Sequence, residues 1–217
     1  MINRRKFSAA TACVLGAAAL GVPQLAWAQK KPEDGSEYKT LDKRVAGEAP
    51  AGKIEVVEFF WYACPHCNVF EPQLEAWSKK LPADVVLRRV PVAFRDDFVP
   101  QQRLFYTLEA MNKLGDLHVK VFQAIHADKQ TLNKEDTILA WAEKNGLDKA
   151  KFAELYNSFA IQTKARRASQ LQDAFKVEGV PALGIAGRWY TDGSMAGNMP
   201  RALQVTDYLL AEARKQK

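Results

Sequence analysis

The chain has 217 residues, of which 47% are hydrophobic and 10% aromatic, and this content excludes a disordered chain and suggests one domain, or one domain with an insertion. The formal net charge of +6 falls to +3 once Arg4, Arg5 and Lys6 are removed with the leader described below. A charge this small gives no reason to expect a nucleic acid or a membrane surface as a partner.

Residues 1–28 are typical of an export signal that is removed. Basic residues precede an uncharged stretch rich in Ala, Leu and Val, and Ala26-Trp27-Ala28 offers a cleavage site of the small-x-small type. Gly16 and Pro23 interrupt the apolar stretch, which favours a signal over a transmembrane helix. The segment "NRRKFS" leaves the general secretory and the twin-arginine routes open, and either route places the mature protein outside the cytoplasm.

The mature chain begins with a strand, helix, strand pattern. Residues 38–45 ("YKTLDKRV") are compatible with an edge strand, and residues 52–62 ("GKIEVVEFFWY") are β-branched and aromatic, as expected of an interior strand. A helical period follows Cys64, in which Pro72 predicts a kink, and residues 84–94 ("DVVLRRVPVAF") predict a further strand. A right-handed crossover should make these last two strands parallel.

A helical block separates this pattern from a returning strand. Apolar residues recur at helical spacing from about Asp96 to Lys176. Strand character returns in "VPALGIAGRWYT", where Ala186-Gly187 favours a hairpin turn, and a last helix is expected from about Asn198. The prediction is therefore an α/β fold interrupted by an inserted all-helical domain. The predicted limits are 1–28 for the cleaved signal, 29–95 and 177–217 for the two parts of the α/β domain, and 96–176 for the helical domain.

Only Cys64 and Cys67 remain in the mature chain, because Cys13 lies inside the signal. A disulfide across two residues closes so small a loop that it removes little entropy from the unfolded chain, which argues against a structural staple. Structural zinc needs about four ligands. The other histidines, His118 and His126, are expected to be partly exposed or capping residues of helices, so no metal is predicted and a redox-active pair remains.

The position of Cys64 favours a reactive thiolate. A strand ends and a helix begins there, so its sulfur should face unpaired N–H groups and the positive end of the helix dipole. Pro65 suits the first helical turn, and His66 can point a ring N–H at the sulfur or add a positive charge. Cys67 should be more buried and act as the resolving thiol. Because only the reduced form carries a charge to stabilise, we expect the pair to donate its disulfide; a solvent-facing His66 without effect is the alternative.

Two further sites fit this chemistry. Glu58 lies on the interior strand six residues before Cys64, where burial would raise the pKa of its carboxyl and let it relay protons. A salt-bridged strand residue is the alternative. A cis bond between Val180 and Pro181 would leave the Val180 backbone free to pair with an extended peptide near the thiols.

The segment "EFFWYACPHC", the helical block, "GVPAL" and the terminal hairpin and helix together resemble the periplasmic DsbA thiol-disulfide oxidoreductases of the thioredoxin superfamily. The resemblance covers residues 38–215 and implies a thioredoxin fold with the inserted helical domain. It also implies roles for individual residues: Cys64 as exposed nucleophile, Cys67 as resolving cysteine, His66 as tuner of redox poise, Glu58 as buried acid, Pro181 as cis-proline, and Val180 as its substrate-binding neighbour. We also expect Pro65 to take part in substrate binding. No basic partner for the buried acid is evident, and Arg95 is only a loose candidate.

The resemblance further implies an enzyme that donates the Cys64–Cys67 disulfide to reduced exported proteins in the periplasm. A strongly oxidising couple is a known property of DsbA, so the resemblance carries the direction of transfer with it. The enzyme would need no cofactor beyond this disulfide and would be recharged by a quinone-linked inner-membrane oxidase of the DsbB type. A monomer that binds no nucleic acid is expected.

Two other functions are compatible with the sequence. A disulfide isomerase or reductase of the same superfamily is one, although the roughly 20 residues between Ala28 and the first strand are too few for the dimerisation domain that periplasmic isomerases usually carry. The other is a non-enzymatic chaperone that binds peptides through an apolar surface around Trp61, Tyr62 and Pro181.

Overall fold

The computed structural model describes residues 31–216, so the predicted signal and Cys13 lie outside the described residues. The elements, in chain order, are β1 (Lys39–Thr40), β2 (Ile54–Phe60), α1 (Pro65–Ser78), β3 (Val85–Pro91), the 3-10 helix η1 (Asp96–Phe98), α2 (Val99–Ala110), α3 (Leu114–His126), α4 (Glu135–Lys144), α5 (Lys149–Tyr156), α6 (Phe159–Ala174), β4 (Ala182–Ile185), β5 (Trp189–Asp192) and α7 (Met199–Arg214).

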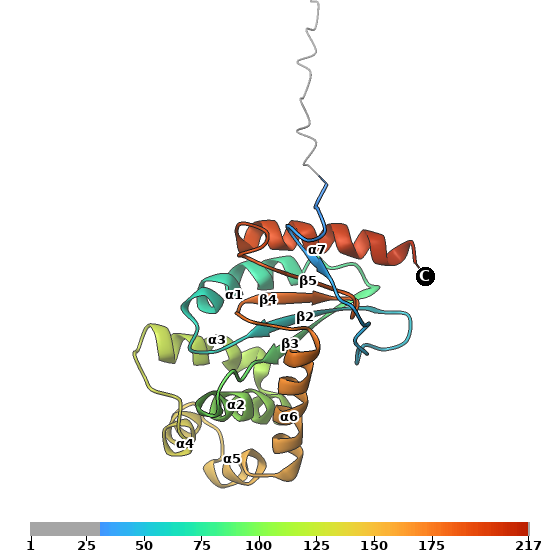
Figure 1. Ribbon diagram of the computed structural model, residues 1–217. Helices are drawn as coiled ribbons and strands as arrows, with labels where there is room; N and C mark the ends of the chain where they lie inside the picture. Colours follow the sequence, from blue (N-terminus) through green and yellow to red (C-terminus); the bar gives the residue numbers. More distant parts are fainter. Residues whose placement is uncertain (1–30, 217) are drawn as a thin grey trace, which may run out of the picture. The chain divides into compact units, whose positions relative to one another are not determined.

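The strands form one sheet in the order β1-β5-β4-β2-β3. Strands β2 and β3 are parallel, as the crossover predicts, whereas the other neighbours are antiparallel. Helices α2 to α6 come between β3 and β4 in the chain and lie together on one side of the sheet, with α7 on the other (Figure 1). The α/β prediction with an inserted run of helices is confirmed, while the exact domain limits stay predictions.

Strand β2 is buried along its whole length. Ile54 and Val56 pack in one apolar cluster with residues of α1 and α7, while Val57 and Phe59 belong to the cluster formed with the inserted helices. Side chains alternate between the two faces of a strand. Glu58 therefore lies on the face of Ile54 and Val56, beneath α1, and its carboxyl group is carried into the interior.

The β4–β5 hairpin turns at Ala186 and Gly187, as expected from the sequence. Both residues have positive φ, 54° and 65°, which matches the type I′ turn of two-residue hairpins. Gly187 also accepts a hydrogen bond from the Val45 N–H at 2.6 Å, and a Cβ at Gly187 would overlap the carbonyl oxygen of Val45. Glycine is thus required here for its backbone conformation and for the close approach of a second chain segment.

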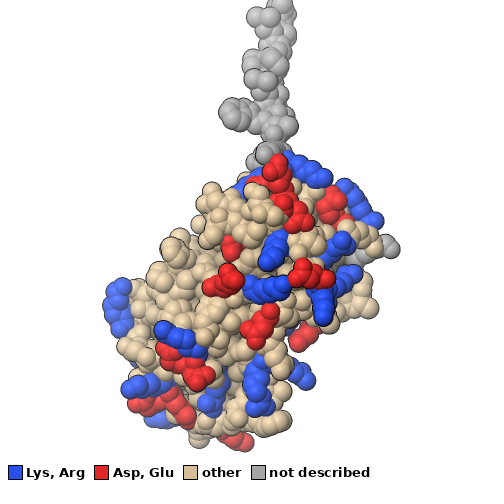
Figure 2. All heavy atoms as spheres, in the orientation of Figure 1, with Lys and Arg blue, Asp and Glu red and all other residues tan. Residues whose placement is uncertain are grey.

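Acidic and basic side chains are interspersed on the face of the molecule drawn in Figure 2, and neither sign dominates it. This distribution agrees with the small net charge expected for the mature chain. Among residues 31–216, none of the helices has both the length and the apolar character that crossing a bilayer requires.

The hairpin turn leads to a stability prediction. Gly146 lies between α4 and α5, outside the hairpin, and serves as the control. Gly146→Ala places a side chain at a positive φ with nothing within 4 Å of the new Cβ, and it should lower the free energy of unfolding by about 1–2 kcal/mol. Gly187→Ala adds the clash with Val45 and should cost roughly 1–3 kcal/mol more. Urea denaturation of both variants measures the difference. Equal losses would contradict the close approach at Val45.

Candidate active site

Cys64 is the N-cap residue of α1, as predicted, with Pro65 at the start of the helix. The Cys64 Sγ accepts a hydrogen bond from the backbone N–H of Cys67 at 3.4 Å, so the sulfur takes the place of the oxygen that usually caps a helix. Cys64 retains 7% of its exposure and Cys67 none, and both are free thiols in this structure. Cys64 is therefore the more accessible sulfur, although it is less exposed than the resemblance implies.

The surroundings of Cys64 lower the pKa of its thiol to about 6. The largest cause is the hydrogen bond that the Cys67 thiol donates to the Cys64 sulfur. Burial opposes it, and the backbone N–H groups of Cys67 and His66 and then the charge of His66 add to it. His66 thus acts through its backbone and its charge. Within residues 31–216 no ring N–H of His66 bonds this sulfur, so that part of the expectation is wrong.

The environment of Cys67 shifts the pKa of its thiol in the opposite direction. Burial raises the pKa of the Cys67 thiol well above its ordinary value, and the hydrogen bond to Cys64 and the charges of Cys64 and Glu58 raise it further. Near neutral pH the reduced pair therefore carries a thiolate on Cys64 and a proton on Cys67. One sulfur is ready to leave or to attack, and the other requires a base before it can react.

The Val180–Pro181 peptide bond is cis, and it brings a distant segment to the thiols. The Cys64 sulfur lies 3.4 Å from the Val180 carbonyl oxygen, across 116 positions of sequence, and donates a hydrogen bond to it when the thiol is protonated. A groove of about 500 Å³ lies alongside, lined by one face of α1, residues 179–181 and parts of the loop before α7. Val69 on its rim is 65% exposed. Val180 and Pro181 line this groove, whereas Pro65 does not.

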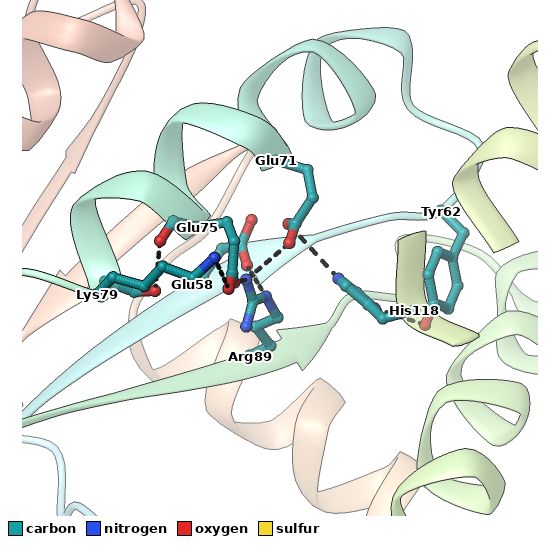
Figure 3. A network of polar contacts seen from close by, with 8 residues as sticks. Glu58, Tyr62, Glu71, Glu75, Lys79, Arg89 and His118 are labelled. Carbon is teal, nitrogen blue, oxygen red and sulfur yellow. Dashed lines mark hydrogen bonds and ion pairs between the residues drawn. The ribbon is translucent and has the colours of Figure 1, made fainter. Parts of the chain in front are cut away.

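Beneath the thiols, Glu58 belongs to a buried cluster of charges (Figure 3). Its Oε2 lies 3.3 Å from Nε of Arg89, the residue directly opposite on β3. Arg89 also contacts Glu71 at 2.7 Å and Glu75 at 3.2 Å, both on α1. Burial raises the pKa of Glu58 to about 8, and the charge of Glu71 raises it while Arg89 lowers it.

Arg89, and not Arg95, is therefore the basic partner of the buried acid. Arg95 lies at the surface, where it pairs with Asp97 at 3.0 Å and keeps 69% of its side-chain exposure. Both expectations for Glu58 apply, because it is a strand residue with an ion pair and also a buried carboxyl whose pKa is raised.

The structure corrects the expectations about His118 and Tyr62, and it confirms that His126, at the end of α3, is partly exposed. His118 is buried, and its Nδ1 lies 2.8 Å from the Tyr62 hydroxyl while its Nε2 lies 3.5 Å from Glu71. Nε2 of His126 lies 2.8 Å from the Tyr62 carbonyl oxygen. Tyr62 itself is fully buried, so it does not belong to an exposed peptide-binding surface, whereas Trp61 is partly buried and stacks on Phe98 with ring centroids 3.8 Å apart.

Sequence reasoning missed Arg89, Glu71, His118 and Tyr62. A register in which β2 and β3 run parallel would have placed Arg89 opposite Glu58. Glu71 lies four residues after Cys67 and hence on the same face of α1, which was a usable signal. The position of His118 depends on how α3 packs against α1, and no local pattern reports that.

Titration can test which contact lowers the pKa of the Cys64 thiol most. Cys67→Ala removes the largest stabiliser of the thiolate and should raise the pKa of Cys64 from about 6 toward its ordinary range. His66→Ala removes only the smaller charge effect, because its backbone N–H is kept, and should raise the pKa less. Thiolate absorbance in the ultraviolet measures both. A larger rise in His66→Ala than in Cys67→Ala would contradict the assignment.

Comparisons with known proteins agree with this geometry. The family model of the DSBA-like thioredoxin domain matches residues 55–204. A thiol:disulfide interchange protein DsbA of Bordetella pertussis is 42% identical over 203 residues, which cover 93% of this chain and 96% of that protein. One of the same name from Pseudomonas aeruginosa is 41% identical over 180 residues, covering 83% of this chain and 85% of that protein.

Solved structures give the same result. The crystal structure of Pseudomonas aeruginosa DsbA superposes with a TM-score of 0.80 at 41% identity, covering 84% of this chain and 94% of that one. The oxidoreductase DsbA from Xylella fastidiosa superposes with a TM-score of 0.79 at 27% identity, covering 85% of this chain and 99% of that one. The chain therefore belongs to the DSBA-like thioredoxin domain family and is a thiol-disulfide oxidoreductase.

Proposed function

We propose that this protein donates the Cys64–Cys67 disulfide to reduced exported proteins during their oxidative folding in the periplasm. The observation that carries the proposal is the opposite shift of the two thiols, because the pKa of Cys64 is lowered to about 6 while that of Cys67 is raised. The reduced pair holds a stabilised charge that the disulfide lacks, so the equilibrium favours passing the disulfide on.

The reaction proceeds in two exchanges. A client thiolate attacks Cys64 Sγ of the oxidised protein, a bond forms between the two sulfurs, and the Cys64–Cys67 bond breaks. The Cys67 sulfur leaves and takes a proton, for which Glu58 is the proposed donor. A second client thiolate then attacks the client sulfur of the mixed disulfide, and Cys64 leaves as a thiolate. The client loses the two electrons that the cysteine pair gains.

Substrate contacts follow from the segment around the cis peptide bond. The carbonyl of Val180 faces Cys64, so an extended client can add main-chain hydrogen bonds at this position. The adjoining groove, lined by Val69, Phe70 and Pro181 among others, offers an apolar surface to client side chains. Main-chain contacts of this kind are compatible with clients of many sequences. A contact between Pro65 and clients stays a prediction.

The remaining assignments are part of the same proposal. A protein that gives its disulfide away must be recharged, and a quinone-linked inner-membrane oxidase of the DsbB type is the proposed partner. The export signal expected in residues 1–28 supports a periplasmic location. We propose a monomer without any cofactor beyond its own disulfide.

The two alternative functions are less well supported. A reductase requires a cysteine pair whose disulfide form is the more stable one, whereas the lowered pKa of Cys64 favours the dithiol form. The chaperone was expected to use Tyr62, which is fully buried.

Variants of the two cysteines separate the two exchanges. Cys64→Ser should abolish the oxidation of a reduced model protein, because the attacked sulfur is gone. Cys67→Ser should also lose turnover but should accumulate a mixed disulfide between Cys64 and its client, which non-reducing electrophoresis detects. Oxidation by Cys64→Ser at the wild-type rate would rule out the proposed function.

A further inference from the structure

The buried cluster around Arg89 contains more negative than positive groups. Glu58 and Glu71 are 1% and 5% exposed, and both face the single guanidinium of Arg89. Glu75 lies further out and is also paired with Lys79 at 3.3 Å. Buried charges without a counter-charge are strongly disfavoured. The inner part of the cluster therefore reaches neutrality only when it holds one additional proton.

That proton has two places to reside. One is Glu58, whose carboxyl oxygens have no hydrogen-bond partner among residues 31–216. The other is His118, whose Nε2 lies 3.5 Å from Oε2 of Glu71, and neither of these two atoms has a hydrogen-bond partner in the described part of the chain. On the other side of the ring, the Tyr62 hydroxyl lies 2.8 Å from Nδ1. A hydroxyl either donates or accepts, so Tyr62 suits a neutral and a protonated His118 equally.

The groups that face His118 come from several elements. Glu71 and Glu75 of α1 favour its protonation, while Arg89 of β3 opposes it. The rings of Phe60 from β2, Phe105 from α2 and Phe122 from α3 itself surround the imidazole. Burial is the largest effect and lowers the pKa of His118. His118 is consequently neutral while Glu58 holds the proton.

His118 and Glu71, but not Glu58, line a cleft of about 510 Å³ between α1, α3 and β3. Nε2 of His118 has no exposed surface of its own, so we infer that its proton exchanges with solvent by way of Glu71, which faces both Nε2 and this cleft. Arg89 stands between Glu58 and Glu71 (Figure 3), and a guanidinium does not give up a proton in proteins. The link between Glu58 and His118 is therefore electrostatic and not a chain of proton transfers.

We propose that His118 is a positioning residue for the chemistry of Cys67, because it takes up a proton from the cleft when Glu58 loses one and so makes ionised Glu58 available as a base. The proposal rests on the redox role proposed above. In a mixed disulfide, ionised Glu58 takes the proton of Cys67, and the Cys67 sulfur attacks Cys64. The Cys64–Cys67 bond forms, the bond to the partner sulfur breaks, and the partner leaves as a thiolate that a proton from water neutralises.

This arrangement has a particular pH dependence. In the wild type, the proton that Glu58 loses to solvent is matched by one that His118 gains from the cleft, so the total number of protons is unchanged and the share of ionised Glu58 varies little with pH. Without a titrating group at position 118, Glu58 must release its proton to solvent. Below its pKa of about 8 the ionised share then falls about tenfold for each pH unit.

The test uses the Cys64–glutathione mixed disulfide of the full protein. Rapid acid quenching measures how fast Cys67 displaces glutathione at a series of pH values. Between pH 6 and pH 8 the wild-type rate should change less than about threefold, whereas the rate of His118→Gln should fall about fiftyfold from pH 8 to pH 6. His126→Gln is the matched control, since it removes a histidine of the same helix that contacts the Tyr62 carbonyl, and it should keep the wild-type slope.

A His118→Gln variant with the wild-type slope would overturn the proposal. Nitrogen NMR of the His118 ring in the wild-type mixed disulfide provides a measurement that needs no variant. The ring should show partial protonation that persists up to the pH at which Glu58 ionises, and a ring that is neutral throughout would overturn the proposal equally. Both readouts follow the glutathione adduct alone, so they remain decisive even if the protein fails to oxidise exported proteins.

Discussion

The hydrogen bonds that converge on the Cys64 sulfur are the interaction on which the rest of the site depends. The sulfur occupies the N-cap position of α1 and accepts from the backbone of Cys67 and from the Cys67 thiol. These bonds are strongest to a thiolate, and the thiol bond disappears when the disulfide forms. The same contacts that begin the helix therefore stabilise the reduced protein against the oxidised one.

The fold keeps the other participants close to this helix start. Cys64 follows the end of strand β2, and the same strand places Glu58 beneath α1. The parallel neighbour β3 places Arg89 opposite Glu58. Strand β4 pairs with the other side of β2 and carries Val180 and Pro181 to the sulfur. Three segments that are distant in sequence thus meet around α1, and α3 of the inserted helices places His118 beside Glu71 of α1.

Features that depend on neighbouring residues could be predicted from the sequence. The Cys-Pro-His-Cys motif at a strand-to-helix junction, the Ala186-Gly187 turn and the start of α7 after Asn198 all carry local signals, and the structure has them where expected. Burial of Glu58 followed from the apolar strand around it.

Features that depend on how elements pack could not be predicted. Arg89 was missed in favour of Arg95 because the register of β2 against β3 was not used. His118 resembled an ordinary helix residue, since its helix gives no sign that this face meets α1. The exposure of Cys64 was overestimated because the Val180 segment, 116 residues away, covers part of its sulfur.

The central claim is that the contacts at Cys64 make the dithiol form the favoured one. Equilibrium of the mature protein with mixtures of reduced and oxidised glutathione at neutral pH tests this directly, because the fraction of reduced protein gives the reduction potential. We expect a potential well above that of thioredoxin, with the dithiol form predominating even where oxidised glutathione is abundant. A potential close to thioredoxin's, about −270 mV, would contradict the account.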